Sequence, residues 1–409
     1  MGRKNIYKIM CILTPLMIML IGLFFSIEKI PDTIFVRDRF EIKSNNILKI
    51  CQSKVNGATT VGKFDNSASD NSKADIKLLG LIPVKSINVK QVPDIMLYPG
   101  GSSIGVKLNT KGVLVVALSD IEVNNGKVSS PAAQSGIMVG DIILSINDKE
   151  IKSAEMMASQ INNCEGKELK VVIERKGESI VKNVKPIKVT DEEKYKIGLW
   201  VRDSTAGVGT LTFYDSKSGN FAALGHPITD VDTGTILCVD RGELISSSIV
   251  NIRKGVRGTP GELKGIFINE NNILGNITSN TVCGIFGKAD KKILSGYKAK
   301  PMKIALRNEI KEGKAQIITT IDDKGPKYYD IKIEKLLNQE TPGPKSMVIK
   351  VTDPELLSKT GGIVQGMSGS PIIQNNKIVG AVTHVLINKP DTGYGIYIEW
   401  MLKDSNLIP

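Results

Sequence analysis

The sequence is poor in the residues that build metal sites and helical bundles. Its 409 residues include only two histidines and five cysteines, and no two cysteines stand in C-x-x-C spacing. A structural zinc site is therefore not expected, and nothing in the sequence suggests a cofactor. Aromatic residues make up only 5% of the chain, whereas glycine occurs 39 times, and this balance favours a mainly β architecture rich in turns.

The cysteine positions allow one disulfide but do not require it. Cys238 and Cys283 could form a bridge in an oxidising compartment, but two free, buried thiols are the favoured state. The cysteines therefore give little information about the redox environment of the chain.

Basic residues are in excess, with a formal net charge of +12, but they do not form a nucleic-acid-binding pattern. No basic run interleaves with aromatics, and the lysines are spread along strand-like segments such as I-K-I-E-K, the solvated face of a sheet. Nucleic-acid binding is therefore not expected. Attraction to anionic lipid headgroups is the favoured use of the excess charge in a membrane-tethered protein.

The N-terminus carries the one long apolar run. Basic residues in 1–8 precede the nineteen residues 9–27, which would span about 28 Å as a helix and match a bilayer core. We expect an uncleaved transmembrane anchor, with residues 1–8 in the cytoplasm and the rest of the chain outside. A cleavable signal peptide is the alternative, although no small-x-small site follows at residues 27–30.

Residues 28–97 are interpreted as a linker with a short β segment. T-I-F-V-R-D-R-F-E-I, from residue 33, alternates as a strand does, and residues 78–92 are again strand-like. Residues 52–74 are polar and small and have no apolar period, which is typical of an unstructured linker.

Residues 98–188 resemble a PDZ domain of the bacterial type. Ser130 precedes a short helix that has Pro at its first turn and Gly at its exit. V-G-D-I-I-L-S-I-N predicts a turn and a strand, Ser153 begins a second helix, and L-K-V-V-I-E-R-K-G is a final strand.

A peptide-binding loop is expected at G-S-S-I-G-V, residues 101–106. The amides of Ser103, Ile104 and Gly105 would face a peptide carboxylate, and the peptide would lie along the next strand and the Ser153 helix. The alternative is a PDZ domain that only packs against its neighbour.

The most specific motif is G-M-S-G-S-P, residues 366–371. Its glycines allow a tight turn in which backbone amides converge on a developing oxyanion. Ser368 would be the nucleophile of a serine protease, and its own amide together with that of Gly366 would form the oxyanion hole. The alternative is a Gly/Ser-rich β-turn.

A base for this serine must be one of the two histidines. His226 ends the small, apolar run F-A-A-L-G-H-P, a context that suits an imidazole at a barrel edge facing a cleft. It precedes Ser368 in the chain, as the base does in double-barrel proteases. His384 follows Ser368 by sixteen residues.

These segments together resemble a known family. T-G-G-I-V-Q-G-M-S-G-S-P-I (360–372), A-L-G-H-P (223–227), the PDZ-like stretch and the apolar N-terminal helix are similar to the stage IV sporulation protein B peptidases of endospore-forming bacteria. The resemblance implies a chymotrypsin-like double β-barrel serine peptidase domain at 189–409.

The resemblance also implies a setting for this activity. Such a peptidase cleaves itself in the N-terminal region, and here residues 52–74 are the exposed segment for that. Its other substrate is a membrane-associated regulator, whose cleavage releases an intramembrane protease that activates a sigma factor, sigma factor K. The place of action is the space between the forespore and mother-cell membranes.

The third member of the triad is the least certain from the sequence. Asp353, in V-T-D-P, matches an acidic position of the family, yet it lies only fifteen residues before Ser368. Asp230 and Asp232 are nearer to His226 in sequence, but a β-turn or a solvated position is expected for them.

Two residues after the nucleophile are candidates for supporting roles. Thr383 stands where such proteases place a hydroxyl that steadies the acid–His pair, and an ordinary strand residue is the alternative. His384, next to it, would line the substrate pocket.

Met367 precedes the nucleophile, where trypsin-like enzymes have an Asp that pairs with a newly cut N-terminus. Activation by such a cut is therefore not expected.

Two other functions stay open, namely a PDZ scaffold with an inactive protease domain and an extracytoplasmic quality-control protease. In the latter class the protease normally precedes its PDZ domains.

Overall fold

The computed structural model describes residues 14, 17, 32–37, 48–52, 72–78, 81–124, 126–189, 193–268, 272–294 and 299–408. Strands dominate this part of the chain, as the composition predicts. Among the described residues no helix is both long enough and apolar enough to cross a bilayer. The expected anchor at 9–27, apart from Thr14 and Met17, and most of the expected cleavage region at 52–74 lie outside the described residues.

The N-terminal part contains a four-stranded sheet in the order β1-β4-β3-β2. Two of its strands confirm the alternating segments seen in the sequence. Phe35 and Val92 from this sheet are buried in the same apolar cluster as the core of the C-terminal barrel. The strands are β1 (Thr33–Arg37), β2 (Leu48–Gln52), β3 (Ser72–Leu78) and β4 (Ile82–Val92).

The first β-barrel is a closed ring of six antiparallel strands. Around the ring, β6 pairs with β15, β15 with β16, β16 with β20, β20 with β19, β19 with β17, and β17 with β6 again. β18 extends β17 as a hairpin outside the ring. The strands are β6 (Ser103–Leu118), β15 (Leu199–Tyr214), β16 (Asn220–Ala223), β17 (Val239–Arg253), β18 (Glu262–Phe267), β19 (Ile273–Thr281) and β20 (Gly284–Ala289).

The second barrel is also a closed ring of six strands. β22 pairs with β23, β23 with β24, β24 with β27, β27 with β26, β26 with β25, and β25 with β22. The elements are β22 (Gly313–Thr319), β23 (Lys327–Leu336), β24 (Met347–Val351), α4 (Pro354–Thr360), β25 (Pro371–Gln374), β26 (Lys377–Leu386), β27 (Lys389–Tyr397) and α5 (Ile398–Asp404). The two closed rings therefore form the double barrel that the Ser368 motif predicts.

A short strand joins the two barrels. β5 (Met96–Pro99) pairs with β15 of the first barrel and with β21 (Met302–Ile304), which pairs in turn with β26 of the second. Two short 3₁₀ helices, η1 (Lys291–Leu294) and η2 (Arg307–Glu309), flank β21 in the sequence. Strand pairing therefore runs continuously from one barrel to the other.

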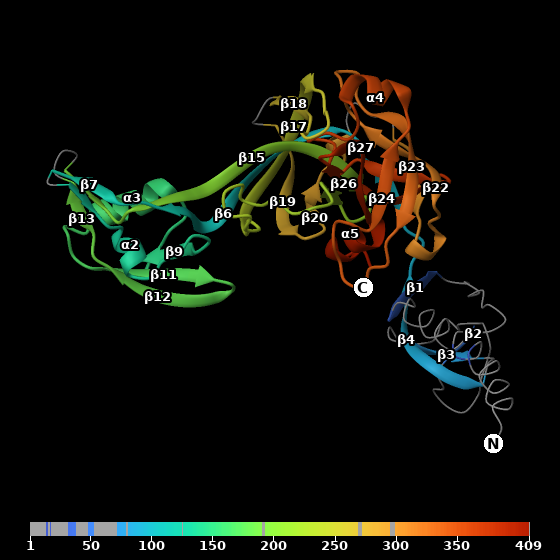
Figure 1. The fold of residues 1–409 in the computed structure, drawn as a ribbon, viewed down its shortest axis with the longest axis horizontal. Coiled ribbons are helices and arrows are strands. Elements are labelled where there is room, and N and C mark those ends of the chain that lie inside the picture. The colour runs from blue at the N-terminus through green and yellow to red at the C-terminus, as the bar shows by residue number, and fades with distance from the viewer. Residues whose placement is uncertain are drawn as a thin grey trace, which may run out of the picture.

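The PDZ region is an excursion between the first two strands of the first barrel. Residues 103–109 of β6 pair with β15 and β17 inside the barrel, whereas Val113–Leu118 of the same strand pair only with β15 and β9. Figure 1 shows the long β6–β15 ribbon that carries this region away from the barrels. The strands β6 and β15, which flank the PDZ region in the sequence, therefore pair both in the first barrel and beside the PDZ elements.

The local elements of the PDZ region agree with the sequence. Ser130 caps α2 with Pro131 in its first turn, and Ser153 caps α3 by accepting from the Met156 amide. Leu169 begins the final strand expected there. The elements are β7 (Ile121–Val123), β8 (Gly126–Val128), α2 (Pro131–Gln134), β9 (Ile142–Ile146), β10 (Lys149–Glu150), α3 (Ala154–Asn162), β11 (Leu169–Arg175), β12 (Glu178–Val184), β13 (Ile187–Val189) and β14 (Lys194–Lys196).

The cysteines that the structure describes in full are not bridged. Cys164, Cys238 and Cys283 are free thiols. Cys283 is buried, as expected, and burial raises the pKa of its thiol well above the usual range. Cys238 is exposed, so the expectation that both thiols are buried holds for only one of them.

Candidate active site

The Ser368 loop lies at the seam between the two barrels. The Thr210 amide on β15 donates to the Ser368 carbonyl at 3.0 Å, so the first barrel holds the loop from one side. The Gly369 amide donates to the Val382 carbonyl on β26 at 2.8 Å, so the second barrel holds it from the other. A residue in this loop can therefore meet side chains from both barrels.

Two glycines make the shape of this loop possible. Gly366 and Gly369 have φ angles of +96° and +97°, a region that favours glycine. A Cβ atom on Gly369 would lie 2.1 Å from the Thr210 carbonyl oxygen. The close approach of the first barrel thus requires glycine next to Ser368.

The amide groups of the loop separate into two sets. The amides of Met367, Gly369 and Ser370 all donate to backbone carbonyls. Within the part of the chain that the structure describes, the amides of Gly366 and Ser368 have no acceptor. These two are the amides predicted for the oxyanion hole, and they are available to a substrate carbonyl.

His226 lies at the end of a tight turn after β16. Leu224 and Gly225 have φ angles of +68° and +70°, and Gly225 lies against the Thr383 side chain. The His226 Nδ1 atom is 2.8 Å from the Pro227 carbonyl oxygen. Because a carbonyl only accepts, Nδ1 carries the proton in the neutral ring, which leaves Nε2 as the basic nitrogen.

Ser368 and both histidines meet in this region, but no hydrogen bond joins Ser368 to His226. The Ser368 hydroxyl donates instead to the Thr383 carbonyl oxygen at 2.8 Å. The rings of His226 and His384 lie side by side, with centroids 5.0 Å apart and planes tilted by 46°. Catalytic hydrogen bonds are often unformed without substrate, so this geometry does not rule out His226 as the base for Ser368.

Both imidazoles are neutral near pH 7. Burial lowers the pKa of His226, and the hydrogen bond to Pro227 opposes this only in part. Burial, the adjacent His226 and the Lys345 ammonium lower the pKa of His384 to about 4. An unprotonated His226 is the form in which an imidazole can accept a proton from a hydroxyl.

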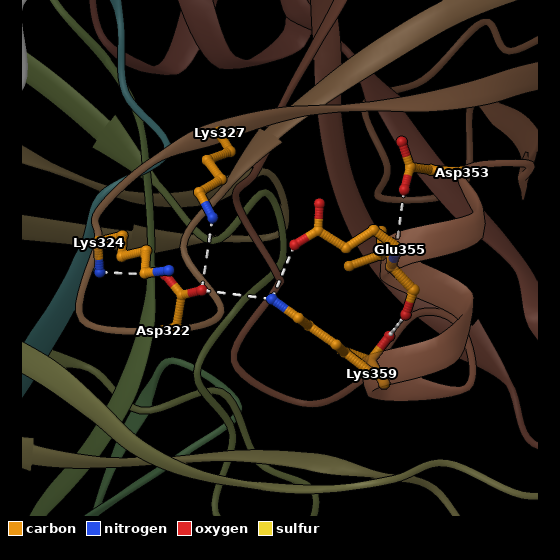
Figure 2. Close-up of polar contacts among 8 residues, drawn as sticks. Asp322, Lys324, Lys327, Asp353, Glu355 and Lys359 are labelled. Atoms are coloured by element: carbon orange, nitrogen blue, oxygen red, sulfur yellow. Dashed lines mark hydrogen bonds and ion pairs between the residues drawn. The ribbon is translucent and has the colours of Figure 1, made fainter.

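The structure does not bring Asp353 to His226. Its Oδ1 accepts from the Leu356 amide at 2.9 Å, which makes it the N-cap of α4, and its Oδ2 accepts from the Asp330 amide at 3.3 Å. Figure 2 shows it at the start of α4, beside a charged cluster built from Asp322, Lys327, Glu355 and Lys359. The expected triad acid is therefore a helix cap in this structure.

Strand register places Asp353 away from the histidines. Val348 on β24 lies opposite Tyr394 on β27, and Tyr394 lies opposite His384 on β26. Asp353 comes five residues after Val348 and beyond the end of β24. His384 is therefore aligned with Val348 near the start of β24, whereas Asp353 follows the opposite end of that strand.

The other acidic and hydroxyl candidates also have partners elsewhere. The Thr383 hydroxyl donates to the Pro344 and Tyr394 carbonyls at 2.6 and 3.2 Å, so it does not support an acid–His pair. Asp230 accepts from groups of its own turn and pairs with Arg202, which confirms the β-turn interpretation. His384, expected in the substrate pocket, lies against His226.

The expected peptide-binding loop of the PDZ domain is placed differently. Ser103, Ile104 and Gly105 lie in β6 between β15 and β17, inside the first barrel. A Cβ on Gly105 would lie 2.7 Å from both Ile245 and Phe267. These residues are therefore part of the barrel wall and do not present amides to a peptide.

A groove in the PDZ region lies beside a second Ile-Gly-hydrophobic sequence, at residues 197–199. Ile197-Gly198-Leu199 repeats the order of Ile104-Gly105-Val106 and leads into the outer half of β15. A cavity of 590 Å³ lies there against α3, and it is lined among others by Met157, Ile161 and Trp200. The repeated I-G-hydrophobic pattern is the sequence signal that could have located this groove.

A second cleft adjoins the oxyanion residues. It has a volume of 570 Å³ and lies beside Gly366, between the inner part of β15 and the hairpin strand β18. Gln365 and Lys264 are among its polar lining residues, and Val208 and Phe267 among its apolar ones. A peptide whose carbonyl occupies the Gly366 and Ser368 amides would continue into this cleft.

Comparisons with known proteins assign two regions of the chain to known families. Residues 102–185 match the PDZ domain family, and residues 193–402 match the family described as SpoIVB peptidase S55. The chain thus carries a PDZ domain together with a domain of a serine peptidase family. More narrowly, the chain belongs to the SpoIVB peptidase family.

Other known proteins are similar to parts of the chain. A probable periplasmic serine endoprotease, DegP-like, of Brucella suis is 26% identical over 196 residues, which span 44% of this chain and 37% of that protein. The Rv3671c protease of M. tuberculosis, in its active form, is 12% identical with a TM-score of 0.31 over 50% of this chain and 74% of its own. The PDZ domain of the SdrC-like protein from Listeria monocytogenes is 21% identical with a TM-score of 0.18 over 22% of this chain and 87% of its own.

The position of Asp353 leads to a direct prediction. Asp353→Asn should keep kcat/KM within about threefold, because asparagine caps a helix nearly as well as aspartate. Asp353→Ala should lower the free energy of unfolding by about 1 kcal/mol through loss of the cap. Peptide hydrolysis and thermal unfolding of both variants measure these effects. A loss of about 10⁴-fold in the Asn variant, as for a triad acid, would return Asp353 to the catalytic machinery.

Proposed function

We propose that this chain is a membrane-tethered, self-cleaving serine endopeptidase that acts outside the cytoplasmic membrane. Ser368 is its nucleophile, His226 its general base, and the Gly366 and Ser368 amides its oxyanion hole. One observation carries the proposal. Of the amides in the tight loop around Ser368, the two without an acceptor in the described chain are those that the reaction needs.

The reaction begins when the Ser368 hydroxyl turns from the Thr383 carbonyl to His226 Nε2. The hydroxyl oxygen then bonds to the substrate carbonyl carbon while its proton passes to Nε2, and the two free amides hold the resulting oxyanion. His226 returns the proton to the amine that leaves as the peptide bond breaks. Water then attacks the acyl-enzyme by the same route and restores Ser368.

The PDZ groove is suited to delivering a peptide segment to this site. A segment held at α3 would be kept near the catalytic seam at a high effective concentration, because the β6–β15 ribbon connects the two regions directly. A peptide there would add to the edge of β15 beside α3. We infer that the groove binds an extended segment of a protein substrate.

Family membership supports a proposal for the physiological role. We propose that the chain cleaves itself between residues 52 and 74 and then cleaves a membrane-associated regulator. That cleavage would release an intramembrane protease and activate a sigma factor during sporulation. The apolar run at 9–27 supports anchoring in the membrane, with the barrels in the space between forespore and mother cell.

Self-cleavage can be tested on the full chain in detergent micelles. The purified wild-type chain should shorten with time, and N-terminal sequencing of the product should place the new terminus within residues 52–74, because that polar segment has no apolar period to fold around. A terminus inside either barrel would contradict the proposed site. A chain that stays intact and resists a fluorophosphonate probe would instead favour an inactive PDZ scaffold.

A further inference from the structure

Strand β18 has two faces of different character. Gly265 and Phe267 line the cleft beside Gly366. Successive side chains of a strand point to opposite faces, so Ile266 belongs to the face that turns away from this cleft. Ile266 and Ile268, which follows the strand directly, are 54% and 48% exposed. The strand that borders the cleft therefore also presents large apolar side chains to solvent.

The turn of the β17–β18 hairpin is also apolar and exposed. Val256 in this turn is 55% exposed, and Ile387 in the adjoining β26–β27 turn is 52% exposed. The Gly258 amide donates to the Ile387 carbonyl at 2.9 Å, and the Gly255 amide donates to the Thr360 carbonyl at 2.8 Å. These bonds fix the turn to the second barrel, so the exposed side chains are held on a rigid support.

The two turns carry an excess of positive charge. Their exposed cations are Lys254, Arg257 and Lys389. The nearby carboxylates are neutralised by other cations, since Glu262 pairs with Arg253 at 3.3 Å and Asp391 pairs with Lys350 at 3.5 Å. Among the described residues of these turns, apolar side chains therefore stand beside cations that are not neutralised.

We propose that this hairpin docks on the surface of an anionic lipid bilayer. Its docking residues, which we call the hairpin surface, are Val250, Lys254, Val256, Arg257, Ile266, Ile268, Ile387 and Lys389. Aliphatic side chains of such a surface enter the boundary between headgroups and acyl chains, and the cations bind the lipid phosphates. Figure 1 shows β17 and β18 projecting from the barrels, so an extended flat surface can reach them. The net charge of +12 attracts the whole chain to the same kind of surface.

This contact is separate from the expected membrane anchor. Thr33 begins β1 six residues after the end of the anchor at residue 27. In Figure 1, β17 and β18 lie on the side of the barrels away from the N-terminal sheet that contains β1. The hairpin surface can therefore bind lipid independently of the anchor, including after the proposed self-cleavage has removed it.

The consequence for substrate choice rests on the catalytic roles proposed above. The cleft beside Gly366 and the outer face of β18 are separated by the thickness of one strand. A bilayer bound to the hairpin surface would thus lie close to the cleft. The structure favours, as substrates, peptide segments of proteins that are attached to an anionic bilayer.

Lipid binding can be measured on the full chain carrying Ser368→Ala, which keeps it in one piece. The anchor is embedded in nanodiscs of phosphatidylcholine, and vesicles of phosphatidylcholine, alone or mixed with phosphatidylglycerol, are then added. Flotation measures binding to the added vesicles. We expect the chain to float only with the anionic vesicles, and less as salt is raised, because salt screens the attraction.

Two pairs of substitutions separate the apolar from the electrostatic contribution. Ile266→Ser combined with Ile268→Ser should weaken vesicle binding roughly tenfold or more, because the apolar side chains that enter the bilayer are lost. Lys254→Gln combined with Arg257→Gln should weaken it about 25-fold, since each cation near an anionic surface contributes a factor of about five. Should the isoleucine pair fail to fold, judged by circular dichroism, the glutamine pair in the exposed turn gives the same comparison.

The PDZ region supplies a matched control. Val139 and Val181 are 49% and 55% exposed, like the isoleucines of the hairpin surface, but they lie outside it. Val139→Ser combined with Val181→Ser should leave vesicle binding unchanged. An equal loss in this control would show that any exposed apolar side chain supports binding, and the hairpin surface would then have no special role.

Activity tests the link to substrate choice. One peptide is supplied free in solution or attached to a lipid in anionic vesicles, and the chain with an intact Ser368 hydrolyses it. Both hairpin pairs should slow hydrolysis of the lipid-attached peptide by the same factor as they weaken binding, and leave the free peptide unaffected. Equal loss on both peptides would contradict the delivery of the cleft to the bilayer.

Other outcomes would overturn the docking surface itself. Equal flotation with neutral and anionic vesicles, or unchanged flotation of both hairpin pairs, would exclude it. Dimers of the wild-type chain that the isoleucine pair abolishes, seen by analytical ultracentrifugation, would assign the face to a second copy of the chain. If the wild-type chain hydrolyses neither peptide but its flotation is as expected, the proposed role of Ser368 fails and the lipid surface stands.

Discussion

Ser368→Ala is expected to abolish peptide-bond cleavage and fluorophosphonate labelling while the chain stays folded. The loss in kcat should be on the order of 10⁵–10⁶-fold, as for removal of a nucleophile in other serine proteases. The structural effect should be small, because within the described chain the hydroxyl makes a single hydrogen bond, to the Thr383 carbonyl. That bond contributes about 1 kcal/mol, which thermal unfolding can measure beside the activity.

The loop contains a matched control for this substitution. Ser370 is fully buried, and its hydroxyl has no hydrogen-bond partner in the described chain. Its amide donates to the Met367 carbonyl and its own carbonyl accepts from Val382, so the loop keeps its shape without the side chain. Ser370→Ala should therefore retain most activity. An inactive Ser370 variant together with an active Ser368 variant would show that the wrong serine of the motif has been assigned as the nucleophile.

Features encoded within a few neighbouring residues were predictable from the sequence. Ser130 and Ser153 precede the helices that they cap, and the two glycines of the Ser368 loop have the positive φ angles that the motif requires. The turn between β25 and β26 falls at Asn375-Asn376, where both residues have positive φ. Each of these signals depends on local backbone conformation, which short sequence patterns determine.

The sharing of one strand between two domains was not predictable. Nothing in the composition of residues 103–118 shows that the first half pairs on both sides in a barrel while the second half pairs with a PDZ strand. The same difficulty applies to the two I-G-hydrophobic patterns at 104–106 and 197–199. Residues 197–199 border the groove only because of the strands with which their neighbours pair, and these strands are distant in the sequence.

Asp353 illustrates how a local helix-start signal and a match to a family position can suggest different roles for one residue. D-P-E-L at 353–356 is a helix start, with an N-cap, a proline in the first turn and an acidic residue after it. That local signal was present in the sequence, but the match to an acidic position of the family suggested a triad role. The contact between His226 and His384 joins residues far apart in the chain, so no local pattern could indicate it.

His226→Ala is expected to have an effect of the same order as loss of the nucleophile. Without a base, the Ser368 hydroxyl keeps its proton and its hydrogen bond to the Thr383 carbonyl, and kcat/KM should fall by about 10⁴–10⁶-fold. Circular dichroism should show an intact fold, because the one hydrogen bond of the imidazole among the described residues is to the carbonyl of the next residue. The measurement is hydrolysis of a short peptide by the full chain.

The wild-type pH profile gives an independent check on this base. An imidazole accepts a proton only when neutral, so activity rises as pH increases through its pKa. Burial lowers the pKa of His226, so the ascending limb should lie below the ordinary histidine value of about 6.5, with a plateau at neutral pH. A triad carboxylate beside the ring would hold its cation and move the limb to higher pH. A limb above that value would therefore mean that an acid outside the described contacts reaches His226, in contrast to the hydrogen bond to Pro227 that the structure shows.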